Sequence, residues 1–81
     1  MTRLWRTGLP ITVMLLGGRP AEIVWGKRRW KVARIAGHWR VDTGWWRFAI
    51  QREYFLLELA GGPMVTIYGD AHGWRLSRLY D

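Results

Sequence analysis

Glycine and proline occur so often in this chain that they limit the length of any regular element. The 81 residues include ten glycines and three prolines. They fall at or within positions 8–10, 17–20, 26, 37, 44, 61–63, 69 and 73. Most of the intervening segments are about five to ten residues long, which suits β-strands better than helices. The sequence therefore predicts an all-β fold.

The segment 50–59 indicates which face of such a strand is buried. Alternate side chains of an extended chain point to opposite faces. The predicted core face carries Phe55, Leu57 and Leu59, and the opposite face carries Arg52, Tyr54 and Glu58. The stretch 44–60 is also long enough for about four helical turns. Its apolar residues are too continuous for an amphipathic stripe, however, so we prefer the strand to the helix.

Turn residues join these segments in sequential order. Gly61, Gly62 and Pro63 predict a hairpin loop before a strand that begins at Met64. Residues 69–73 predict the turn into a last strand over 74–80. Sequential hairpins favour an antiparallel meander that curls into a small, partly closed barrel, because curling protects the edges of the sheet. We predict a single β domain over 1–81, in which 1–19 is an N-terminal extension with a first strand.

The charge balance points to a polyanionic partner. Thirteen Lys and Arg residues against six Asp and Glu residues give a formal net charge of +7. Nucleic acid is the default partner for so basic a small domain. Eleven of the thirteen cations are arginines, whose planar guanidinium groups suit phosphate contacts and stacking on rings.

Residues that usually carry catalysis or bind metals are scarce. The chain has no cysteine, and its only histidines and serine are His38, His72 and Ser77. No nucleophile motif surrounds Ser77, and Asp70 with His72 lacks the further ligand that a metal site needs. We predict no enzyme activity, metal, cofactor or small-molecule substrate. A deep pocket that joins His38 or His72 to a carboxylate would favour an enzyme instead.

The N-terminal stretch does not favour export or membrane insertion. Basic residues precede an apolar run over 11–16, as in a signal peptide, but the run is short and no small-residue cleavage site follows closely. No apolar stretch approaches the roughly 20 residues of a membrane helix. We expect a cytoplasmic protein that makes no membrane contact.

Basic residues alternate with tryptophans in the middle of the chain. Small barrels that bind nucleic acid combine cations for phosphates with rings on which bases stack. The predicted contacts to phosphate or to an acidic protein surface are Lys27, Arg28, Arg29, Lys31, Arg40, Arg47 and Arg52. Trp39 and Trp46 are the predicted stacking residues. Cations on solvated strand faces and rings in the core would give the same pattern without any binding role.

Trp45 and Trp46 are neighbours, so an extended chain would point them to opposite faces. Trp45 lies nearer the turn that Asp42 and Gly44 predict. We therefore expect Trp45 in the core and Trp46 at the surface, an order that a β-bulge would reverse.

A resemblance to a known family adds a biological setting. The pattern that carries it is Pro20-x-x-Ile23-x-Trp25-Gly26, Trp39-Arg40-Val41-Asp42-x-x-Trp45-Trp46, Arg52-x-Tyr54-Phe55, Tyr68-x-Asp70, Trp74 and Tyr80-Asp81. Through this pattern, residues 20–81 resemble an uncharacterised small bacterial domain similar to the C-terminal tail of ImuB-type proteins, which are Y-family DNA polymerase relatives of the mutasome. The resemblance implies a role beside translesion synthesis and contacts with other mutasome proteins. The chain has no polymerase palm or fingers, so the resemblance does not extend to DNA synthesis.

These observations predict a non-enzymatic accessory domain that binds DNA, or a DNA-bound translesion polymerase assembly, through an Arg-rich face that contains tryptophan. The alternative is a protein–protein interaction module of a mutasome-like complex without direct nucleic-acid contact, because Trp, Tyr and Arg also dominate protein interfaces. Phosphate binding weakens steeply with salt, so salt dependence separates the two.

Overall fold

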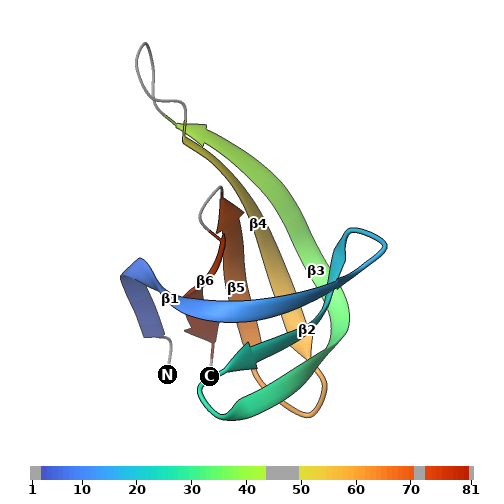
Figure 1. Cartoon of the computed structure of the whole chain (residues 1–81). Helices are drawn as coiled ribbons and strands as arrows, with labels where there is room; N and C mark the ends of the chain where they lie inside the picture. The colour runs from blue at the N-terminus through green and yellow to red at the C-terminus, as the bar shows by residue number, and fades with distance from the viewer. Residues whose placement is uncertain (1–2, 44–49, 71–72, 81) are drawn as a thin grey trace.

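A computed structural model describes residues 3–43, 50–70 and 73–80, and the regular elements of these residues are all β-strands (Figure 1). The strands are β1 (Arg3–Leu16), β2 (Arg19–Trp25), β3 (Arg28–Thr43), β4 (Ile50–Leu59), β5 (Met64–Asp70) and β6 (Gly73–Tyr80). The described residues include no helix of the length and apolarity needed to cross a membrane. The all-β prediction is confirmed.

Each strand pairs antiparallel with the next one along the chain, and β1 also pairs with β6. This last pairing closes the sheet into a barrel (Figure 1). The turn between β1 and β2 consists of Gly17 and Gly18, and both have positive φ, as the tightest β-hairpin turns require. The predicted antiparallel meander is confirmed, and the barrel is closed where the sequence predicted partial closure.

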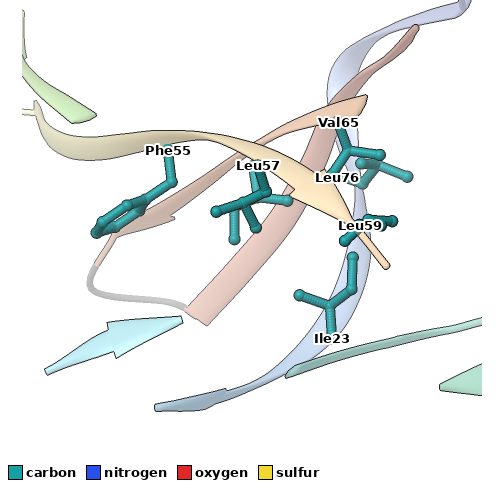
Figure 2. Close-up of a cluster of buried hydrophobic side chains, with 7 residues drawn as sticks. Ile23, Phe55, Leu57, Leu59, Val65 and Leu76 are labelled. Atoms are coloured by element: carbon teal, nitrogen blue, oxygen red, sulfur yellow. The ribbon is translucent and has the colours of Figure 1, made fainter. Parts of the chain in front are cut away.

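Apolar side chains from four strands fill the interior of the barrel. The buried cluster consists of Ile23, Phe55, Leu57, Leu59, Val65, Ile67 and Leu76. Figure 2 shows the side chain of Leu76 beside that of Val65, and Leu59 near Ile23 on β2. Burial of each such side chain contributes about 1.5–3 kcal/mol. The core face predicted for residues 50–59 is confirmed.

β3 is one long strand, whereas the sequence predicted separate segments on either side of Gly37. Its register with β4 shifts between Val32 and Arg34, and again between Ile35 and Gly37. Each shift has the character of a β-bulge, which inserts a residue into one strand and bends it. β3 therefore continues through Gly37 and curves around the barrel (Figure 1).

The distal ends of β3 and β4 form a two-stranded ribbon that extends past the other strands (Figure 1). β3 and β4 stay paired as far as Thr43 opposite Ile50, but the pairing of β4 with β5 ends where Glu53 lies opposite Gly69. We call residues 40–43 and 50–52 the ribbon.

The prediction that residues 50–59 form a strand and not a helix is confirmed, because they are β4.

Candidate nucleic-acid interface

The outer face of β3 carries three cations and a tryptophan. Trp30 lies opposite the buried Ile23, so its neighbours Arg29 and Lys31 point to the outside of the barrel. After the first bulge the outer position is Arg34, opposite Glu58 on β4, and after the second bulge it is Trp39, opposite Tyr54. The resulting set, which we call the outer β3 strip, consists of Arg29, Lys31, Arg34 and Trp39.

Carboxylates on neighbouring strands hold two of these cations. Arg29 Nε lies 3.1 Å from Glu22 Oε1 on β2, and Arg34 Nε lies 3.1 Å from Glu58 Oε2 on β4. The two arginine side chains are 69% and 66% exposed, so solvent limits each ion pair to about 0–1 kcal/mol. Both contacts use Nε, which leaves the terminal guanidinium nitrogens as the groups that a phosphate would contact. Lys31 is exposed and forms no ion pair with any described residue.

Trp39 is the exposed end of a row of rings on the same outer face. The Trp39 and Tyr54 rings are almost parallel, with centroids 5.5 Å apart and planes inclined by 4°. Tyr54 in turn contacts Tyr68, with centroids 5.2 Å apart. Tyr68 is only 4% exposed, whereas Trp39 is 43% exposed. Trp39 is therefore the member of the row on which a nucleic-acid base can stack.

Arg52 on β4 supports this row of rings. Its guanidinium carbon lies 4.8 Å from the centroid of Tyr68, which is a cation–π distance. A side-chain hydrogen bond with Tyr54 is the largest cause that raises the pKa of Arg52; burial opposes it, and the charges of Tyr68 and Asp70 add to it. Arg52 Nε is buried and has no hydrogen-bond partner among the described residues. Arg52 therefore holds the tyrosine rings in place while it keeps its positive charge.

A second cluster of cations and rings lies where β2 turns into β3. Trp25 and Trp30 are stacked with centroids 6.0 Å apart, and the Arg28 guanidinium lies 4.6 Å from the Trp30 ring. Both indoles pack partly against the core, and Lys27 is exposed in the turn. Nine positions of β3 separate Trp30 from Trp39, which is about 30 Å along an extended strand. The structure therefore does not bring Lys27 and Arg28 together with Trp39.

Arg40 lies on the other face of β3. It is opposite Glu53, and its neighbour His38 is opposite Phe55. Because successive residues of a strand point to opposite faces, Arg40 does not share a face with Trp39. His38 Nε2 lies 2.7 Å from Glu53 Oε1, and the His38 ring stacks on Phe55 with centroids 4.2 Å apart.

His38 also lines an open hollow of about 230 Å³ beside β3. The other lining residues are Arg19, Ile35, Ala36, Gly37 and Phe55. Glu53, whose carboxylate contacts His38, is not among these lining residues. Within the described part of the chain, no three His, Cys, Asp or Glu residues are grouped so that they could hold a metal ion. The prediction that the protein is not an enzyme stays a prediction.

Some predicted residues lie outside the described ranges. They are Trp46 and Arg47 of the predicted interface, together with Trp45 and His72. The predicted core position of Trp45 and surface position of Trp46 therefore stay predictions.

The interface predicted from the sequence left out three residues that lie at or near it, Arg34, Tyr54 and Tyr68. Tyr54 alternates with Arg52 along one segment, so a common face for these two was visible in the sequence. Tyr68 joins them only because β5 pairs with β4 in the register that sets it opposite Tyr54. Arg34 joins the outer face only because of the bulge that precedes it.

No protein-family model, curated protein or solved structure is significantly similar to this chain. The resemblance to ImuB-type tails, and the role beside translesion synthesis that it implies, stay predictions. Any functional conclusion for this chain therefore depends on the chemistry of its own surface.

Proposed function

We propose that this protein is a non-enzymatic accessory domain that binds DNA through the outer β3 strip. The observation that carries the proposal is the position of Trp39 on β3. Its side chain is 43% exposed, its ring is stacked on that of Tyr54 of β4, and β3 also carries outward-facing cations. The cations attract phosphates, and the indole offers a face for a base. Because Tyr54 already restrains the indole, binding costs little additional side-chain entropy.

The charge of the whole chain and the resemblance support the same function. A net charge of +7 draws the protein toward any polyanion and speeds encounter with DNA. The resemblance to ImuB-type tails suggests a DNA-bound translesion polymerase assembly as the setting. In such an assembly, this domain holds its partners near the DNA and performs no chemistry itself.

A protein contact is the second candidate function, and the hairpin of β1 and β2 favours it. Met14 and Leu15 are each 50% exposed, and Leu16 is 77% exposed. Exposed apolar side chains that gather at one place on a surface are a feature of protein interaction sites, and these three lie together at the end of β1. This candidate uses residues of β1, whereas the DNA candidate uses β3, so single substitutions separate the two.

The DNA candidate is tested by fluorescence anisotropy with a labelled single strand and a labelled duplex at low salt. Substitution Trp39→Ala should weaken the tighter of the two complexes about 5- to 150-fold, because a stacked base contributes about 1–3 kcal/mol. The melting temperature should change little, since Trp39 is not part of the core cluster.

The matched control is Leu16→Ser, which removes another exposed apolar side chain but leaves β3 intact. It should bind DNA as the wild-type protein does. If the wild-type protein binds neither form of DNA, the DNA proposal is wrong and the protein-contact candidate takes its place. If Trp39→Ala binds as tightly as wild type, Trp39 does not belong to the interface.

A further inference from the structure

We infer that the DNA form this protein selects is a single strand, which follows β3 with its phosphates on the cations and one unpaired base on Trp39. The inference rests on the proposed function and adds the class of nucleic acid that the same surface recognises. It follows from the shape of the Trp39 site, the line of cations and the carboxylates beside that line.

The Trp39 site is built for the flat face of a base. Its indole is parallel to the Tyr54 ring to within 4°, so a base stacked on the indole would extend an existing row of rings. Inside a duplex, the faces of a base are covered by its neighbours. Bases of single strands are free to leave the stack and lie on aromatic side chains. Trp39 therefore favours an unpaired base.

The cations of the outer β3 strip form one line. Arg29 and Lys31 are alternate residues and lie about 6.6 Å apart along the strand. Arg34 follows on the same face after the first bulge, and Trp39 follows after the second. A single line of cations that ends at a ring suits one extended backbone whose bases can turn toward the protein.

Carboxylates flank this line on both sides. Glu22 on β2 pairs with Arg29, and Glu58 on β4 pairs with Arg34. Phosphates placed beside the line would approach these carboxylates, and like charges repel. A narrow polyanion can follow β3 between them, whereas the two backbones of a duplex would spread over β2 and β4 as well.

The ribbon of β3 and β4 raises the competing possibility of duplex binding. A two-stranded ribbon fits the major groove, where polar side chains read base edges through hydrogen bonds. On the outer face at the base of this ribbon, the pairs are Trp39 with Tyr54 and Val41 with Arg52. Arg52 is partly buried against Tyr68, so this face offers rings and apolar surface more than hydrogen-bond donors.

The test compares three kinds of labelled DNA with the full chain. The first is a set of oligothymidylates of about 4, 8 and 16 nucleotides, the range of site sizes known for small barrels. The second is a duplex equal in length to the longest of them. The third is an abasic oligonucleotide of the same length, which keeps the phosphates but lacks the bases. Anisotropy gives the affinity, and tryptophan fluorescence reports stacking.

We expect the longest oligothymidylate to bind about 5- to 150-fold more tightly than the duplex or the abasic strand, because only it can place a base on Trp39. Its binding should quench tryptophan fluorescence, and Trp39→Ala should remove that part of the quenching. Trp39→Phe should retain more affinity than Trp39→Ala, since a ring remains for the base to stack on.

The outcomes separate this inference from the proposed function. If the duplex binds as tightly as the single strand, or the abasic strand binds as tightly as oligothymidylate, the inference is overturned while DNA binding stands. If none of the three DNA forms binds, both proposals fail. If Trp39→Ala keeps the full quenching, the base stacks elsewhere and the inference is again overturned.

Discussion

At the scale of single residues, Gly8 allows the backbone of β1 to pass close to the side chains of Tyr68 and Arg75. Its φ of 78° lies in the left-handed region, and its carbonyl oxygen accepts a hydrogen bond from Arg75 Nη1 at 3.5 Å. A Cβ at this position would lie 2.5 Å from the Tyr68 hydroxyl oxygen and 2.8 Å from Arg75 Cβ. Gly8 is thus required twice, by its backbone angle and by the close approach of Tyr68.

Substitution Gly8→Ala should therefore destabilise the protein more than the same change at Gly17. Gly17 also has positive φ, but nothing lies within 4 Å of the added Cβ. The backbone angle alone costs about 1–2 kcal/mol, and we expect the contact with Tyr68 to add about 1–3 kcal/mol at Gly8. Urea denaturation of both variants measures the difference. Equal losses of unfolding free energy would show that the β1 segment shifts away from Tyr68 at little cost.

At the scale of elements, β3 and β4 serve both the barrel and the ribbon. Inside the barrel each has two neighbouring strands, and their inward side chains join the core. In the segment 50–52, which precedes Glu53, β4 pairs only with β3 among the described strands. A two-stranded hairpin without a core is marginally stable. The Trp39–Tyr54 stack and the His38–Glu53 contact lie where the ribbon leaves the barrel, and both strengthen its attachment there.

The backbone amides of the ribbon should exchange with solvent faster than those of the barrel. Local opening of a two-stranded segment exposes little apolar surface, so its free energy is lower than that of global unfolding. Hydrogen exchange followed by NMR should show weaker protection at Val41 and Asp42 than at Leu57 and Ile67. The buried pair serves as the internal reference. Equal protection at all four amides would mean that ribbon and barrel open only together.

At the scale of the whole molecule, the cations that give the net charge of +7 differ in the groups that surround them. Arg29 and Arg34 lie beside carboxylates, whereas Arg28 and Arg52 lie against rings. Lys31 is exposed, with no ion pair to the described residues. Lys31 is therefore the cation of the outer β3 strip that is most available to a phosphate.

The salt dependence of DNA binding should show whether Lys31 contacts a phosphate. With a single strand, each phosphate contact contributes about −0.7 to the slope of log affinity against log salt concentration. Lys31→Gln should therefore make the slope shallower by about 0.7. The matched control is Arg19→Gln, which removes one exposed charge beside the hollow that His38 lines. If Arg19→Gln makes the slope shallower and Lys31→Gln does not, the phosphates lie beside the hollow and not on the outer β3 strip, and the proposal is wrong.

Local patterns in the sequence were sufficient to predict that this fold consists of strands, although β1 continues through Gly8 and Pro10 and β3 through Gly37, where the sequence predicted breaks. Frequent glycine and proline indicated short strands, and the alternation of Phe55, Leu57 and Leu59 identified a buried face. The hairpin at Gly61–Pro63 was predictable for the same reason, because turn residues act through their own backbone angles. The cationic and aromatic character of β3 was also evident without the structure.

The grouping of side chains on β3 was decided by tertiary structure. Strict alternation would place Trp39 on the same face as Lys31 but Arg34 on the opposite face. The first bulge returns Arg34 to the outside, and the second bulge keeps Trp39 there. Such bulges arise where a long strand must curve around a closed barrel, so their positions depend on the neighbouring strands. The sequence by itself determined which residue types β3 carries. Only the closure of the barrel, by fixing register and curvature, determined that Arg34 shares the outer surface with Lys31 and Trp39.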